Sequence, residues 1–275
     1  MTLDPGRVLG AQMPERAFVW SQRDAILYAL GVGCGAEDRR FVYEDELVSV
    51  PSFATVVCNV KMFDAAALGI DYAGLVHSGQ SIELHQPFPT EGEAILSKRV
   101  VGLWDRGAER GAVLAVETGV NDAATGARIA TVVNEMMARR NGGFGGSLDG
   151  MPEPAPAHSP EQTRAMPTRE DQALLFRLSG DWNPLHADPE TARAAGFPGP
   201  ILHGMCTYAL CCRAVMAEYG VAPEQVLRHE ARFSAPVYPG ETVSVGMARR
   251  GSEIYFCAHV GERQVVRNGR TTLRA

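Results

Sequence analysis

The alternation of apolar and polar positions predicts the same series of elements twice along the chain. In the C-terminal half, residues 204–220 (GMCTYALCCRAVMAEYG) are apolar on almost every side, which predicts a buried helix. Strand-like segments separated by turn residues follow at 231–238, 242–250, 254–261 and 263–269. Similar segments end the N-terminal half at 93–107, 112–120 and 128–140. We predict one buried helix wrapped by several antiparallel strands in each half.

A shorter helix precedes this arrangement in both halves, and the spacing suggests a duplication. Residues 23–33 (RDAILYALGVG) and 170–180 (EDQALLFRLSG) share an acid, an apolar helical stripe and a closing glycine. In the second, Thr168 and Asp171 resemble a capping box, and Gly180 is a plausible end. The matched pairs are Asp24 with Asp171 and Gly33 with Gly180, 147 residues apart, and Gly92 with Gly240 and Glu93 with Glu241, 148 apart.

A stretch rich in glycine and proline, residues 141–162, separates the two halves and has no helical or strand periodicity. We therefore divide the chain into an N-terminal unit at 1–140, a linker at 141–165 and a C-terminal unit at 166–275.

Composition indicates a globular protein that binds neither nucleic acid nor membrane. The 275 residues are 45% hydrophobic and 21% charged, which allows a buried core. The net charge is −6, and no block rich in lysine and arginine marks a nucleic-acid interface. No apolar run approaches the roughly 18 residues of a membrane span, and the N-terminus lacks an apolar signal core. We expect a cytoplasmic protein.

The cysteines and histidines do not form a recognisable metal motif. None of the six cysteines belongs to a Cys-x-x-Cys pair, and the seven histidines lack zinc-site spacing. We expect the cysteines to be small buried hydrophobes in a reducing compartment, and we expect no metal site.

Residues 180–189 (GDWNPLHADP) place an acid, an amide and a histidine within six positions. Pro184 pushes Asn183 towards an extended conformation, so the loop can turn Asp181, Asn183 and His186 towards one small volume. Taken singly, Asp and Asn are common turn residues and a lone histidine is more often structural. Gly204, taken alone, is merely a glycine at a helix start.

The joint pattern favours chemistry, because it resembles a known family. Residues 178–207 (LSGDWNPLHADPETARAAGFPGPILHGMCT) strongly resemble the signature of MaoC-like, R-specific (type 2) enoyl-CoA hydratases. Residues 233–242 resemble a later strand-and-turn element of that family. The N-terminal half is similar to the two-domain members at 28–33, 41–46, 50–54, 74–89 and 142–146. The resemblance implies an α+β double hotdog fold, in which each half is a long buried helix wrapped by an antiparallel β-sheet.

The resemblance also implies roles for individual residues. Asp181 and His186 would bind and activate water and shuttle a proton, and which of them removes the water proton stays open. Asn183 would orient the water or support the other two. The backbone N–H of Gly204, at a helix N-terminus, would stabilise an oxyanion. The N-terminal half lacks the Asp-x-Asn-Pro-x-His core and would shape the pocket for the acyl tail.

The implied reaction is reversible R-specific hydration of trans-2-enoyl-CoA to (3R)-3-hydroxyacyl-CoA, in fatty-acid or sterol side-chain metabolism. Coenzyme A would belong to the substrate, with no separate cofactor, and a homodimer is expected. One alternative is a dehydratase for substrates on acyl-carrier protein, which would need a basic docking patch. Another is a non-catalytic acyl-CoA-binding protein, whose mark would be loss of Asp181 or His186; both are present.

Some residues carry weaker expectations. The family often has His-Gly-Glu-Gln where this chain has residues 77–80 (HSGQ), and Arg-Gly where it has 140–141 (RN), departures that bear on substrate preference. Glu44 matches a glutamate considered important in some relatives, but a solvated or structural acid fits it at least as well. We expect His203 to be structural, bonding backbone near the helix start. Three cations that could meet coenzyme A phosphates, or simply lie at the surface, are Lys61, Lys98 and Arg177.

Overall fold

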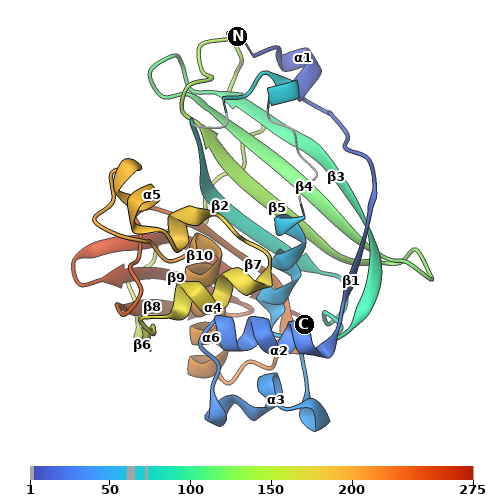
Figure 1. Cartoon of the computed structure of the whole chain (residues 1–275), viewed down its shortest axis with the longest axis vertical. Coiled ribbons are helices and arrows are strands. Elements are labelled where there is room, and N and C mark those ends of the chain that lie inside the picture. Colours follow the sequence, from blue (N-terminus) through green and yellow to red (C-terminus); the bar gives the residue numbers. More distant parts are fainter. Residues whose placement is uncertain (1–2, 61–65, 72–73, 275) are drawn as a thin grey trace.

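All strands of the described chain join one antiparallel sheet, whose two halves come from the two halves of the sequence (Figure 1). The computed structural model describes residues 3–60, 66–71 and 74–274. The sheet has ten strands in the order β1-β3-β4-β5-β2-β7-β10-β9-β8-β6. They are β1 (Arg16–Trp20), β2 (Leu75–Leu84), β3 (Gly92–Asp105), β4 (Ala112–Asp122), β5 (Arg128–Ala138), β6 (Gln162–Pro167), β7 (Val226–Phe233), β8 (Thr242–Arg250), β9 (Glu253–Val260) and β10 (Arg263–Leu273).

Helices lie mainly on the inner face of this sheet (Figure 1). The α-helices are α1 (Pro5–Val8), α2 (Gln22–Gly31), α3 (Arg39–Val42), α4 (Gln172–Phe176), α5 (Pro189–Ala194) and α6 (Gly204–Tyr219). The 3-10 helices are η1 (Ala36–Asp38), η2 (Glu44–Glu46), η3 (Pro51–Asn59), η4 (Ala66–Leu68), η6 (Arg177–Ser179), η7 (Pro184–His186) and η8 (Pro223–Gln225).

The buried helix predicted for the C-terminal half is confirmed. Helix α6 has 16 residues, and all but a few are buried against strands β6 to β10 and β2. In the N-terminal half, the corresponding place against β2, β4 and β5 is taken by the nine-residue 3-10 helix η3. Pro51 starts η3, and β-branched Val56 and Val57, which are less favoured in α-helices, follow within it. The α+β class with two sheet-wrapped halves is as predicted, with a shorter and tighter helix in the first half.

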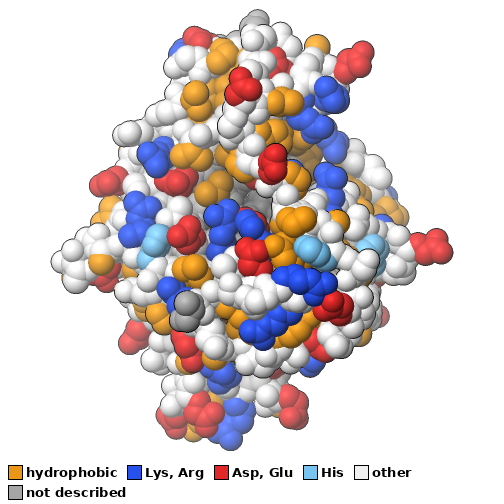
Figure 2. Space-filling model, turned by 180° about the vertical axis from the view of Figure 1, so that it is seen from behind, with side chains coloured by type: hydrophobic (Ala, Val, Ile, Leu, Met, Phe, Trp, Pro, Cys, Tyr) orange, Lys and Arg blue, Asp and Glu red, His pale blue; other side chains and the backbone are white. Residues whose placement is uncertain are grey.

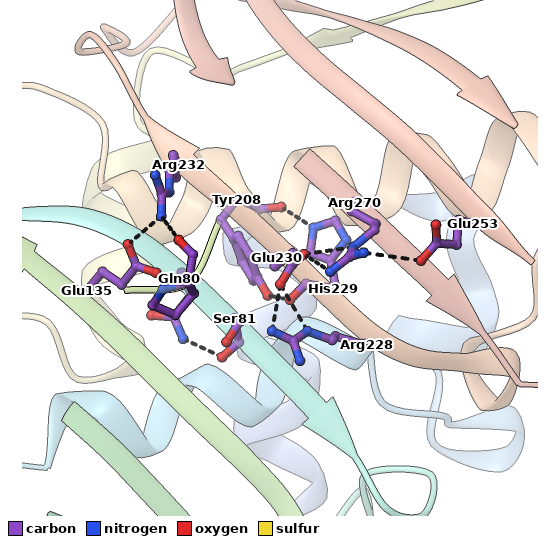
Figure 3. Close-up of polar contacts among 11 residues, drawn as sticks. Gln80, Ser81, Glu135, Tyr208, Arg228, His229, Glu230, Arg232, Glu253 and Arg270 are labelled. Carbon is purple, nitrogen blue, oxygen red and sulfur yellow. Dashed lines mark hydrogen bonds and ion pairs between the residues drawn. The ribbon is translucent and has the colours of Figure 1, made fainter. Parts of the chain in front are cut away.

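The two halves are joined edge to edge by antiparallel pairing of β2 with β7. Polar contacts line this seam (Figure 3): the guanidinium of Arg232, on β7, lies 3.4 Å from the carboxylate of Glu135, on β5. On the C-terminal side, Glu230 accepts ion pairs from Arg228 at 2.7 Å and from Arg270 at 2.6 Å. The seam is therefore a continuous hydrogen-bonded ladder reinforced by partly buried ion pairs.

The two short helices α2 and α4 form a second contact between the halves. The side-chain amide of Gln172, which is buried, donates hydrogen bonds to the carbonyls of Gly31 at 2.5 Å and Leu30 at 3.4 Å. A Cβ atom on Gly31 would lie 3.2 Å from the Cα of Phe176, so glycine permits this close approach. Gln172 thus gives the Gly31 carbonyl, at the end of α2, a stronger donor than its other partner, the Cys206 thiol at 3.5 Å.

The predicted start of the second short helix is wrong, and its predicted end is confirmed. Helix α4 begins at Gln172, and the Thr168 hydroxyl donates to the Glu241 carbonyl at 2.7 Å, so it forms no capping box. Gly180 ends the following turn in the left-handed region, at φ +111°, where glycine has no steric cost. The apolar stripe predicted for the second short helix is only partly buried, because Leu174 and Leu178 are exposed.

The molecular surface carries both signs of charge. Figure 2 shows Lys and Arg side chains interspersed with Asp and Glu over the face turned away in Figure 1. The cysteines are unpaired thiols, and Cys34, Cys206, Cys211 and Cys212 are buried, as expected of small hydrophobes. Among the described residues, no helix is both long enough and apolar enough to cross a membrane.

We predict that Gln172→Ala lowers the free energy of unfolding by about 1–3 kcal/mol, because it leaves the carbonyl of Gly31 with only the weak Cys206 thiol as a donor. Urea denaturation measures this change. Leu174→Ala, two positions away at a side chain that is 52% exposed, is the control and should shift stability by less than about 0.5 kcal/mol. Equal effects of the two substitutions would contradict the role given to Gln172.

Candidate active site

A tight loop after α4 presents the predicted site residues. Gly180 reverses the chain with its positive φ, and Asp181 follows directly. The Oδ1 atom of Asn183 accepts the N–H of Leu185 at 3.0 Å, so Asn183 caps the 3-10 turn η7. The turn ends at His186, which is buried. The side chain of Asn183 is exposed and turned to its own backbone, so it does not point towards the other predicted residues, although the Asn183 N–H donates to Oδ1 of Asp181 at 3.2 Å.

Asp181 and His186 converge with a third residue, His203, for which we expected a structural role. Ligand atoms of these three side chains lie within 4.8 Å of one another. The two imidazole rings stack with centroids 3.7 Å apart and an interplanar angle of 27°. His203 does contact backbone, as expected, but its partner is the carbonyl of Asp181 at 3.3 Å, in the loop and not at the start of α6. His203 therefore links the helix α6 to the loop.

Backbone carbonyls define the tautomers of both rings. The Nδ1 atom of His186 lies 2.8 Å from the Ile201 carbonyl, which can only accept, so Nδ1 carries the proton and Nε2 remains a free acceptor. By the same reasoning, Nε2 of His203 donates to the Asp181 carbonyl. The Nδ1 atom of His203 is buried without a hydrogen-bond partner among the described residues. The ring of His186 is thus held with its basic nitrogen available.

Burial keeps both imidazoles uncharged. Desolvation lowers the pKa of His186, and the Ile201 carbonyl and the charge of Asp181 oppose the shift only in part. Desolvation, together with the proximity of His186, lowers the pKa of His203 to about 4. At neutral pH the site therefore pairs a neutral imidazole with a nearby acid, an arrangement suited to taking up and returning a proton.

Gly204 begins α6 beside this cluster. Its backbone N–H has no hydrogen-bond acceptor among the described residues. A Cβ atom at this position would lie 3.5 Å from the ring of Phe233, in ordinary contact. Since the N-terminus of a helix favours negative charge, this amide can donate to an oxygen that becomes anionic.

The N-terminal half, expected to shape the acyl pocket, also places a histidine near the site that the sequence analysis did not single out. His77, on β2, packs edge-on against Phe233 with centroids 5.1 Å apart, and its Nε2 lies 2.9 Å from the Gly79 carbonyl. Burial lowers the pKa of His77, and the charge of Asp181 is among the influences that oppose the shift. In η3, the side-chain amide of Asn59 donates to the carbonyl of Ser179 at 3.2 Å. The one signal in the sequence that pointed to His77 was the departure of residues 77–80 from the family's usual His-Gly-Glu-Gln.

The same three side chains could hold a divalent metal ion. One carboxylate and two imidazoles are a donor set that such ions accept, and their ligand atoms are close enough. The face-to-face stacking of the rings suits shared burial better than ligation, because ligation turns ring nitrogens towards one point. The chemistry proposed below uses the side chains themselves.

The remaining candidates fall outside the cluster. Glu44 is exposed in η2, in keeping with a solvated acid. Arg177 lies over the exposed ring of Trp182, with its guanidinium 4.6 Å from the centroid. Lys98 is buried, contrary to a surface role. Lys61 lies outside the described residues.

We predict that the free energy of unfolding decreases as pH falls from about 6.5 to about 4, because the unfolded chain binds protons that buried His203 excludes. The part due to His203 is at most about 3 kcal/mol. Urea titrations across this range should show a shallower pH dependence for His203→Gln than for the wild type. His85→Gln, at an exposed histidine, is the control. An unchanged slope in His203→Gln would refute the prediction.

Comparison with known proteins supports the two-part architecture. Residues 152–269 match the MaoC like domain, and residues 18–140 match the MFE-2 hydratase 2 N-terminal domain. The chain is 40% identical to 3-hydroxyacyl-thioester dehydratase Y of Mycobacterium tuberculosis, over 89% of this chain and 87% of that protein. It is 35% identical to enoyl-CoA hydratase ChsH3 of the same organism, over 92% of each.

Solved structures agree with these relationships. A MaoC-like dehydratase from Phytophthora capsici superposes with a TM-score of 0.89, at 27% identity and 99% coverage of both chains. The peroxisomal multifunctional enzyme type 2 of Drosophila melanogaster superposes with a TM-score of 0.81, at 31% identity, over 96% of this chain and 48% of that one. The chain therefore belongs to the two-domain MaoC-like hydratases, in which a hydratase 2 N-terminal domain precedes a MaoC like domain.

Proposed function

We propose that this protein is an enoyl-CoA hydratase 2, a hydro-lyase that adds water reversibly to trans-2-enoyl-CoA and yields (3R)-3-hydroxyacyl-CoA. The observation that carries the proposal is the neutral His186 ring, held with Nε2 free beside Asp181 and next to the unpaired amide of Gly204. The names of two relatives, a 3-hydroxyacyl-thioester dehydratase and an enoyl-CoA hydratase, describe this reaction in its two directions.

In the proposed mechanism, water lies between the carboxylate of Asp181 and Nε2 of His186. One of these groups removes a proton as the water oxygen bonds to the β-carbon of the enoyl group. The electron pair of the double bond moves towards the thioester, and the pair then returns to bond a proton at the α-carbon. The proton taken from water can thus be delivered to the α-carbon, which balances the addition. General acid–base groups of this kind contribute about 10²–10⁴-fold.

The developing charge on the thioester oxygen would be met by the N–H of Gly204. Removing one such donor typically costs about 3–4 kcal/mol of transition-state stabilisation. His203 would act as a positioning residue, since its ring stacks on His186 and its Nε2 holds the Asp181 carbonyl. Because Asp181 and His186 come from one loop, water would attack from one side of the substrate, which favours a single product stereoisomer.

The remaining parts of the proposal concern setting and organisation. We propose a catalytic C-terminal unit at 166–275 joined by the linker at 141–165, whose last four residues already belong to β6, to an N-terminal unit at 1–140 that shapes the acyl pocket. The mechanism needs no separate cofactor. We propose that the protein is a homodimer. We also propose that it is cytoplasmic, because its free thiols favour a reducing compartment. On the face shown in Figure 2, basic and acidic side chains are mixed, so this face offers no basic docking patch for an acyl-carrier protein.

We predict that Asp181→Asn lowers kcat/KM for trans-2-enoyl-CoA by about 10²–10⁴-fold, because the amide cannot accept a proton. Loss of the conjugated enoyl-thioester absorbance follows the reaction, and chromatography of the product should give the R isomer. Asp188→Asn is the matched control: Asp188 caps α5 through the amides of Glu190 and Thr191, and asparagine caps a helix equally well. Activity in Asp181→Asn close to wild type, or an S product, would overturn the proposal.

A further inference from the structure

A lysine is buried in the N-terminal half, and within residues 3–60, 66–71 and 74–274 it has no counter-charge. Lys98 lies on the inner face of β3 and is only 7% exposed. Among the described residues its ammonium has one hydrogen bond, to the Val60 carbonyl, at the long distance of 3.5 Å. Its neighbour Arg99, on the outer face, is exposed and paired with Glu117 at 2.9 Å. Lysine is almost never this buried unless it is paired, so we expect the ammonium of Lys98 to have an anionic partner.

Further unsatisfied polar groups share this inner face. Strand register places Thr118, on β4, directly opposite Lys98, and its hydroxyl is buried without a hydrogen bond. On the next row of the same face, Asn134 of β5 lies opposite Gln80 of β2, and Oε1 of Gln80 is likewise buried without a partner. Lys98, Thr118, Asn134 and Gln80 form what we call the inner polar stripe. A purely structural core would favour apolar residues at these positions.

The inner polar stripe is linked to the catalytic loop through η3. Helix η3 packs on this face, where the Cys58 thiol donates to Oδ1 of Asn134 at 3.0 Å. The next residue, Asn59, bonds the Ser179 carbonyl, two positions before Asp181. From β2 through β5 and β4 to β3 are three interstrand steps, a distance of roughly 14 Å. The stripe therefore leads away from the reacting centre into the half that would hold the acyl tail.

We propose that the inner polar stripe binds the far end of the acyl chain, and that the preferred substrate carries a carboxylate there, which pairs with Lys98. The inference rests on the function proposed above and specifies its substrate class. A carboxylate would supply a counter-charge that the described residues do not provide, and its oxygens would accept hydrogen bonds from the ammonium and the Thr118 hydroxyl. Burial also lowers the pKa of the Lys98 ammonium, a shift that a bound anion would oppose.

The test compares trans-2-enoyl-CoAs that end in a carboxylate with those of the same length that end in a methyl group. Across a graded series of lengths, we expect the wild type to show a kcat/KM ratio of at least about tenfold in favour of the carboxylate at its best length, equivalent to about 1.4 kcal/mol. Lys98→Met keeps the apolar stem and removes the ammonium, so the ratio should fall to about one or below. Arg99→Met, which removes the same charge from the outer face, is the control and should keep the wild-type ratio.

The outcomes separate this inference from the proposed function. A wild type that prefers the methyl-ended chain at every length overturns the inference without any variant, and so does a ratio that Lys98→Met leaves intact. Should Lys98→Met fail to fold, the near-isosteric Thr118→Val must lower the ratio several-fold. A four-carbon enoyl-CoA is too short to reach Lys98 at the far end of the stripe, so its turnover reports the reaction itself. If the four-carbon substrate is turned over but the longer chains show no preference for a carboxylate end, only the role of the stripe is refuted. If no enoyl-CoA of any length is turned over, the proposed function is refuted.

Discussion

The antiparallel pairing of β2 with β7 is the contact on which the rest of the molecule depends. It converts two sheet-wrapped halves into one continuous sheet, so that the inner face of β2 borders the catalytic loop of the other half. His77 reaches Phe233 and the surroundings of Asp181 only because of this register. A slip by one residue would turn its inner side chains outward, since successive strand residues point to opposite faces. The site is therefore a product of both halves, although its central residues come from one.

Desolvation governs the chemistry of the site. The stacked rings of His186 and His203 are buried together, which keeps both neutral and leaves one basic nitrogen free beside a carboxylate. Desolvation also acts on Lys98 at the other end of the inner face, because burying an ammonium costs free energy unless it is paired. One end of this surface thus holds groups that can transfer a proton, and the other holds buried polar groups with few or no hydrogen-bond partners among the described residues.

Several features were predictable because their causes are local in the chain. Helix α6 was visible from its uninterrupted apolar run, and the end of the second short helix from Gly180, whose positive φ few other residues tolerate. The start of that helix was misjudged because the Thr168 hydroxyl bonds Glu241, a residue distant in sequence. Asn183 was grouped with Asp181 and His186 by spacing, whereas its side chain caps its own turn.

The sequence by itself determined the fold class, the duplication and the short loop that carries Asp181 and His186, because apolar periodicity and a six-residue motif are encoded by neighbouring positions. Tertiary structure alone decided that His203 stacks on His186, that His77 joins the site and that Lys98 lies buried opposite Thr118. These contacts depend on strand register and on the meeting of two halves, and pairings between distant segments leave no local periodicity to read.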